Sequence, residues 1–238
     1  MSAADGVAHV ITLPAWIELS AVTFGALSGA LHATRMKLDP VGVFTIALIS
    51  AVGGGVIRDV LLQDGIPVFL VTSTYLELAA LAAAVGFFFA GAVRAARPVM
   101  EVVDTLLIGA WVLIGAERAL VLGLPGSTAV LIGVITASFG GIVRDVLCRQ
   151  VPPTIVQPGE WYAAAAILAA ISFVVLVAAG VDQHVAEIST LVIAAGARWL
   201  SLARGWRTPT AFGLWSDLAD RLEQARLRDL AHRRDWRG

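Results

Sequence analysis

The sequence predicts an all-α integral membrane protein with seven transmembrane helices, arranged as two inverted three-helix repeats followed by a seventh helix. The first observation is composition: 58% of the 238 residues are hydrophobic and 15% are charged, whereas about a quarter of the residues in a soluble domain are charged. The second is a succession of apolar runs, each near the roughly 20 residues that cross a bilayer core. The third is a motif that occurs twice. Together they indicate a duplicated membrane domain.

The apolar runs set the limits of the expected helices. These are 16–34, 40–62, 69–92, 103–122, 127–148, 160–181 and 185–203. They leave a segment, 1–15, before the first helix and a tail, 204–238, after the last. No basic residue precedes the first apolar run, so we expect no cleaved secretory signal and a first helix that stays in the membrane.

The repeated motif appears when the sequence is shifted by 86 positions, which places Gly54–Leu61 over Gly140–Leu147 with six of eight residues identical. The other two positions exchange Val and Ile. The same shift pairs further residues: Gly29 with Gly115, Ala30 with Ala116, Pro67 with Pro153, Tyr75 with Trp161, and Glu18 with Asp104. We therefore assign 16–92 to a first three-helix repeat and 103–181 to a second.

Because each repeat has an odd number of helices, the second copy must enter the membrane from the opposite side. Inverted repeats of this kind recur in transporters, where interrupted helices of the two halves meet near the midplane. The helix expected at 185–203 lies outside the repeat.

Basic residues in the short loops predict the orientation, since Lys and Arg collect on the cytoplasmic side. One side carries Arg35, Lys37, Arg94, Arg97, Arg149 and the Arg-rich tail, and the other carries Arg118. We expect an inner (plasma) membrane protein with its N-terminus outside and its C-terminus in the cytoplasm. In the tail, Leu214, Leu218, Leu222 and Ala225 recur near helical spacing, which is typical of a basic amphipathic helix on the lipid surface. A solvated anchor is the alternative.

Glycines and small residues interrupt the second and fifth helices at matching places. The first cluster is Gly53, Gly54 and Gly55, and the second is Ser138, Phe139, Gly140 and Gly141. Glycine destabilises a helix, and unpaired backbone groups are tolerated in a membrane only inside protein or facing water. We expect both helices to break here and line a site. Close helix packing through small residues is the alternative.

An arginine and an aspartate follow each glycine cluster, as Arg58 with Asp59 and Arg144 with Asp145. Charges in lipid must be paired or hydrated, and adjacent residues on a helix do not face each other. We therefore expect partners from elsewhere: for Arg58, Asp145 or the helix-start acids Glu18 and Asp104, and for Arg144, Asp59 or the other acid. Snorkelling of the arginines to the interface is the alternative.

Nothing indicates a metal or an enzyme. Cys148 is the one cysteine, and His9, His32, His184 and His232 share no ligand-like spacing. We find no nucleophile elbow and no acid and base placed around a pocket. Thr45, Ser50, Thr136 and Ser138 either offer hydroxyls to a hydrated path or bond to their own helix backbone.

These residues resemble the prokaryotic trimeric intracellular cation (TRIC) channels. The resemblance rests on the doubled Gly-Gly-x-x-Arg-Asp-x-Leu motif, on the proline six residues after each Leu, and on Arg198-Trp199-Leu200 with Gly205-Trp206 and Pro209. It implies a homotrimer with a potassium-permeable pore in each protomer, lined by the second and fifth helices. It places the kinks at the two glycine clusters, where Phe139 replaces an expected glycine and could form a hydrophobic constriction.

The expected function is a monovalent cation channel in which carbonyl and hydroxyl oxygens replace part of the ion's hydration shell. The expected partners are other copies of the chain, lipids and the transported potassium ion, with no cofactor and no nucleic acid. An unpaired arginine in the pore would favour anions instead. The alternative is a secondary transporter of a small neutral solute such as glycine, because proteins with this duplicated domain have also been labelled glycine transporters.

Overall fold

The computed structural model describes residues 15–63, 65–95, 97–150 and 162–205, and its regular secondary structure there is helical. The helices are α1 (Ala15–Arg35), α2 (Pro40–Leu62), α3 (Val68–Val71), α4 (Ser73–Phe88), α5 (Ala90–Ala95), α6 (Arg97–Val121), α7 (Gly126–Leu147), α8 (Tyr162–Ala178) and α9 (Gln183–Arg204). The expected N-terminal segment, apart from its last residue, and almost all of the amphipathic tail lie outside the described residues.

Most expected helix limits agree with the structure, and one expected helix is divided. The ranges 16–34, 40–62, 127–148 and 185–203 correspond to α1, α2, α7 and α9 within two residues. The single helix expected over 69–92 is wrong, because that range contains α3, α4 and α5. Thr72 separates α3 from α4 in an extended conformation (φ −116°, ψ 109°), and Phe89 (φ −114°, ψ 29°) ends α4.

Length and hydropathy identify helices that can cross a bilayer. Among the described residues α2, α7 and α9 are long and apolar enough to do so, and α4 and α8 are shorter apolar helices. The helices α1 and α6, of 21 and 25 residues, complete the two halves. The chain is thus a membrane protein, in which three to five spans are evident from composition and length.

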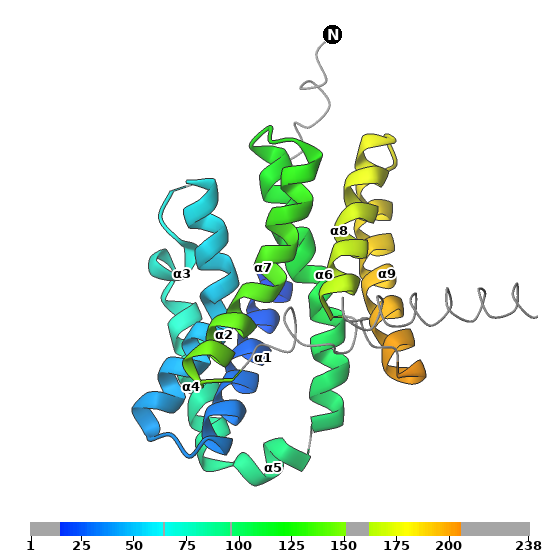
Figure 1. Cartoon of the computed structure of the whole chain (residues 1–238). Coiled ribbons are helices and arrows are strands. Elements are labelled where there is room, and N and C mark those ends of the chain that lie inside the picture. The colour runs from blue at the N-terminus through cyan, green and yellow to red at the C-terminus, as the bar shows by residue number, and fades with distance from the viewer. Residues whose placement is uncertain (1–14, 64, 96, 151–161, 206–238) are drawn as a thin grey trace, which may run out of the picture.

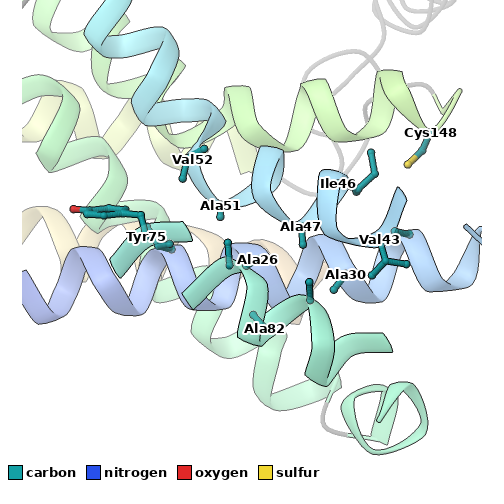
Figure 2. Close-up of a cluster of buried hydrophobic side chains, with 14 residues drawn as sticks. Ala26, Ala30, Val43, Ile46, Ala47, Ala51, Val52, Tyr75, Ala82 and Cys148 are labelled. Atoms are coloured by element: carbon teal, nitrogen blue, oxygen red, sulfur yellow. The ribbon is translucent and has the colours of Figure 1, made fainter. Parts of the chain in front are cut away.

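The helices form two similar groups, with α1, α2 and α4 packed together in one and α6, α7 and α8 in the other (Figure 1). The groups meet where α2 packs on α7 and α1 packs on α6, and α9 covers α6 and α8. Alanine dominates the buried contacts of the first group, as Ala26, Ala30, Ala47 and Ala51 show in Figure 2. Small side chains let membrane helices approach closely, so these cores depend on short interhelical distances.

The repeat extends to individual contacts between helices. A Cβ atom added at Gly29 would meet the side chain of Ser50 and the carbonyl oxygen of Ile46. A Cβ atom at Gly115 would meet the corresponding atoms of Thr136 and Ile132 at 2.5 and 2.9 Å. These positions are 86 residues apart in each case. The duplication is therefore preserved in packing as well as in sequence.

Two glycines allow this close packing to be tested. Gly115→Ala places a methyl group against two backbone atoms and a hydroxyl on α7, and we expect a loss of about 1–3 kcal/mol, typical of overpacking. Gly196→Ala in α9 serves as the control, because nothing lies within 4 Å of the added atom. The control should be neutral or slightly stabilising. Melting temperatures of the two variants in detergent measure the difference, and equal melting temperatures would contradict the packing.

Candidate functional site

The central feature is the place where α2 and α7 cross. A Cβ atom at Gly54 would overlap the carbonyl oxygen of Thr136, and one at Gly140 would lie 2.9 Å from the carbonyl oxygen of Ser50. Gly54 and Gly140 are 86 residues apart, and so are Ser50 and Thr136. Each contact is therefore the repeat equivalent of the other, and a local twofold axis relates them. As α2 advances from Ser50 to Gly54, its contacts on α7 run back from Gly140 to Thr136. The helices therefore cross antiparallel, backbone against backbone.

The glycines do not break these helices, contrary to the sequence-based expectation. Both α2 and α7 are continuous α-helix through their glycine clusters, and α2 changes direction beside Val52 without losing its helical structure (Figure 2). The physical reason is the packing at the crossing, where the opposing backbone covers the carbonyl groups of Ser50 and Thr136. The two glycine clusters thus act as contact surfaces between the continuous helices α2 and α7.

The expected partners of Arg58 were also wrong. Its Nε donates a hydrogen bond to Oδ1 of Asp59 at 2.8 Å, and a terminal guanidinium nitrogen lies 2.7 Å from the same oxygen. The side chain folds back along the helix, with a terminal nitrogen 4.0 Å from the position that a Cβ of Gly55 would occupy. The long arginine side chain thereby reaches its neighbour although the two Cβ atoms point apart.

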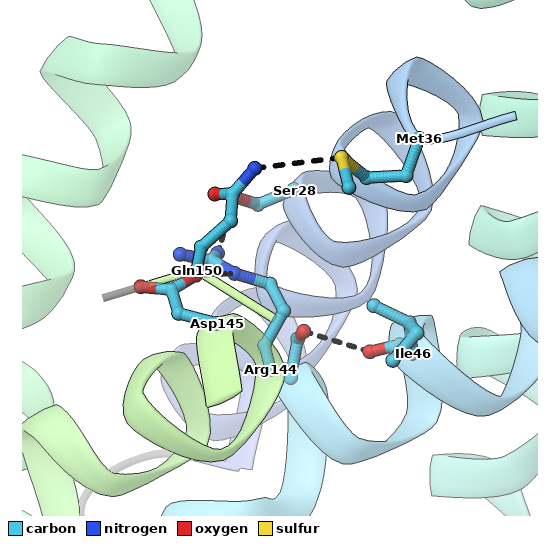
Figure 3. A network of polar contacts seen from close by, with 7 residues as sticks. Ser28, Met36, Ile46, Arg144, Asp145 and Gln150 are labelled. Carbon is cyan, nitrogen blue, oxygen red and sulfur yellow. Dashed lines mark hydrogen bonds and ion pairs between the residues drawn. The ribbon is translucent and has the colours of Figure 1, made fainter. Parts of the chain in front are cut away.

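The second half repeats the arrangement. Nε of Arg144 donates to Oδ1 of Asp145 at 2.8 Å, and a terminal nitrogen lies 3.9 Å from the Cβ position of Gly141. A further terminal nitrogen of Arg144 donates to the hydroxyl of Ser28 on α1 at 3.4 Å (Figure 3). Each half therefore pairs its own charges, and neither arginine is left without a carboxylate.

The two pairs differ in how completely they are satisfied. Asp59 uses both oxygens, because Oδ2 accepts the backbone N–H of Val68 at 3.3 Å. Asp145 is 1% exposed, and its Oδ2 has no hydrogen-bond partner among the described residues. The Arg58 side chain is 6% exposed and that of Arg144 is 19% exposed. On α7 the arginine is thus the more exposed partner and the aspartate the more buried one, and that aspartate keeps an acceptor oxygen unused among the described residues.

A small cavity adjoins the pair on α2. Its volume, counted as the space that the centre of a water molecule can occupy, is about 20 Å³. This is enough for roughly one water. Glu18, Tyr75 and Trp111 line it together with Arg58 and Asp59. Glu18 of α1 and Tyr75 of α4 lie on the wall of this cavity. The side chain of Asp104, the counterpart of Glu18, lies outside the described part of the structure.

The hydroxyl groups mostly bond to their own helices. Thr45 donates to the carbonyl of Val41 at 2.8 Å, and Ser50 and Thr136 donate to carbonyls four residues earlier at 2.7 Å. Ser138 differs: it is 2% exposed, and its hydroxyl has no partner among the described residues. Phe139 next to it is partly exposed. Ser138 is therefore the hydroxyl with spare capacity at the crossing.

Sequence reasoning missed two residues near the second cluster. The hydroxyl of Tyr162 on α8 donates to the carbonyl of Ala137 on α7 at 3.0 Å, and the guanidinium of Arg198 lies 5.7 Å from the centre of the Tyr162 ring. Only the family resemblance drew attention to Arg198, and nothing singled out Tyr162. Within residues 15–63, 65–95, 97–150 and 162–205, no three His, Cys, Asp or Glu side chains are placed to hold a metal ion.

The packing and the doubled Arg–Asp pairs define a membrane protein built from a duplicated three-helix domain. A sequence model described as "Glycine transporter" matches the chain twice, over residues 15–91 and 101–178. The chain therefore belongs to this family, which includes membrane proteins known as UPF0126.

Relatives and solved structures agree with this assignment. A UPF0126 membrane protein of Vibrio cholerae is 37% identical over 190 residues, 77% of this chain and 78% of that protein. The inner membrane protein YadS of Escherichia coli K12 is 35% identical over 158 residues, 66% and 75% of the two chains. A TRIC cation channel structure superposes with a TM-score of 0.77 at 27% identity, covering 84% and 97%. The TRIC channel orthologue of Rhodobacter sphaeroides gives 0.73 at 30% identity, covering 80% and 97%.

The unequal burial of the two pairs predicts unequal sensitivity to mutation. Arg58→Gln strands the buried carboxylate of Asp59, and removing one partner of a buried pair costs about 3–5 kcal/mol. The double variant Arg58→Gln/Asp59→Asn removes both charges and should recover most of that stability. Arg144→Gln should cost at least as much, because the carboxylate that it strands, Asp145, is more deeply buried than Asp59. Melting temperatures of the three variants in detergent measure the order, and a double variant no more stable than Arg58→Gln would contradict it.

Proposed function

We propose that the protein is a potassium-permeable, monovalent cation channel with one pore in each protomer. The observation that carries the proposal is the structural likeness to TRIC cation channels at 27% and 30% identity, which covers 97% of each of those chains. The duplicated Gly-Gly-x-x-Arg-Asp-x-Leu motif, on which the resemblance to these channels rests, supports the proposal. A fold alone does not define a function, so the site must supply the remaining argument.

The proposed path follows the α2–α7 crossing, with one Arg–Asp pair near each end. Both arginines are neutralised locally, which removes the repulsion that a free positive charge would exert on a cation at a low-dielectric constriction. Asp145 Oδ2 and the hydroxyl of Ser138 are buried acceptors without described partners. Such oxygens are the groups that replace hydration water around a cation. In the present conformation the backbones touch at Gly54 and Gly140, so an open path requires α2 and α7 to separate.

The remaining proposals concern assembly and topology. We propose seven spans in two inverted repeats plus α9, a homotrimer, an outside N-terminus, and a cytoplasmic basic tail that contacts lipids. The antiparallel crossing supports the inversion, and the neighbour described as a trimeric intracellular cation channel supports the trimer. Crosslinking of the protein in native membranes tests the trimer directly.

The description of the matching family favours a second function, transport of a small neutral solute such as glycine. Touching helices of two inverted halves also suit alternating access, in which one half moves against the other around a central site. Slow uptake that saturates and is competed by unlabelled solute favours the transporter, whereas unitary currents favour the channel.

The pure protein in a planar bilayer under a potassium chloride gradient tests the channel. We expect unitary currents that reverse near the potassium equilibrium potential. Absence of currents from folded, inserted protein that takes up radiolabelled glycine would overturn the channel in favour of the transporter.

Two variants test whether the pair on α7 borders the path. Asp145→Asn leaves the positive charge of Arg144 unbalanced and should move the reversal potential toward that of chloride. Arg144→Gln should move it the other way or leave it at the potassium value, since a carboxylate then faces the path alone. Equal reversal potentials in wild type and both variants would place the path elsewhere.

A further inference from the structure

At the crossing, α7 is attached to a neighbouring helix as well as to α2. Tyr162, the first residue of α8, donates its hydroxyl hydrogen to the carbonyl oxygen of Ala137 at 3.0 Å. Ala137 directly follows Thr136, whose carbonyl oxygen meets Gly54 of α2. The α7 backbone at the crossing is therefore bound on consecutive residues, to α2 through Thr136 and to α8 through Ala137.

The ring of Tyr162 is fixed in turn by α9. The guanidinium of Arg198 lies 5.7 Å from the ring centre, within the range of a favourable cation–π interaction. Tyr162 also packs against a cluster that contains Ala137, Ala166 and Ala194, from α7, α8 and α9. Two contacts thus connect α9, which has no counterpart in the repeat, with the backbone of α7.

This connection exists in one half of the molecule. The shift of 86 residues places Leu76 at the position of Tyr162 and Ala51 at that of Ala137. The side chain of leucine has no hydrogen-bond donor. The neighbouring Tyr75 lines the cavity beside Glu18 of α1. The twofold relation that governs the crossing is therefore broken at Ala137 of α7.

We propose that Tyr162, oriented by Arg198, is a positioning residue that holds α7 in its packed position against α2. This role rests on the proposed function, because it becomes visible as gating only if ions pass beside the crossing. Loss of the hydroxyl frees one attachment of α7 and favours separation of the helices. Because Tyr162 acts on α7 through its hydrogen bond to Ala137, loss of the hydroxyl leaves the residues that line the path unchanged.

Tyr162→Phe isolates the hydroxyl, because it keeps the ring beneath Arg198. We expect the ratio of open to closed time in bilayer recordings to rise about fivefold, with unitary conductance and reversal potential unchanged. A factor of five corresponds to roughly 1 kcal/mol, the net contribution of one hydrogen bond. Arg198→Gln should act in the same direction, and the double variant should not exceed the sum of the two effects. Ser172→Ala is the matched control, since it removes an α8 hydroxyl that bonds within its own helix.

Amide hydrogen exchange in nanodiscs provides a readout that does not depend on transport. Tyr162→Phe should speed exchange over residues 136–141 severalfold, and Ser172→Ala should not. Faster exchange in a protein that passes no current, wild type included, would contradict the channel while supporting the positioning role. Unchanged exchange and unchanged gating in Tyr162→Phe would overturn the positioning role, as would an equal response of Ser172→Ala or a changed unitary conductance.

Discussion

The structure depends on the direct contact of two helix backbones at the α2–α7 crossing. Gly54 and Gly140 have no room for a side chain, because each faces a carbonyl oxygen of the opposite helix. This contact brings the two halves together and sets the antiparallel direction in which they meet. It also places an Arg–Asp pair beyond the crossing on each helix, so that the charged groups lie on either side of the closest approach.

The Gly-x-x-Arg-Asp sequence works as a self-contained unit in each half. The arginine folds back along its helix, with a terminal nitrogen about 4 Å from the Cβ position of the glycine, and the following aspartate receives its hydrogen bonds. Burying a charge in a membrane protein requires such compensation, and here the compensation is local to one helix. The two units differ in their surroundings, since Asp59 is fully bonded and Asp145 retains a free acceptor among the described residues. A symmetric fold thus contains two chemically unequal ends.

The sequence predicted the limits of α1, α2, α7 and α9 and the duplication, because apolar length and a repeated motif are encoded locally. It misplaced the partners of Arg58 and Arg144, because adjacent Cβ atoms point apart on an ideal helix, whereas an arginine side chain is long enough to fold back to the next residue. The sequence also predicted that α2 and α7 break at their glycine clusters, whereas both helices continue through them. Tyr162 was missed because its contact with Ala137 joins residues 25 positions apart and carries no motif. Local sequence patterns do not predict the tertiary contacts of single hydroxyl groups.

The most direct test of the account uses thiol reagents applied to each side of a bilayer. Gly55→Cys and Gly141→Cys are the chosen sites, because they are repeat equivalents whose nearest neighbour is a flexible arginine about 4 Å away; the background is Cys148→Ser. A charged, membrane-impermeant methanethiosulfonate reagent should block current through Gly55→Cys from one side only and through Gly141→Cys from the opposite side only. Block of both from the same side would contradict the inversion, and modification without any change in current would contradict a path along the crossing.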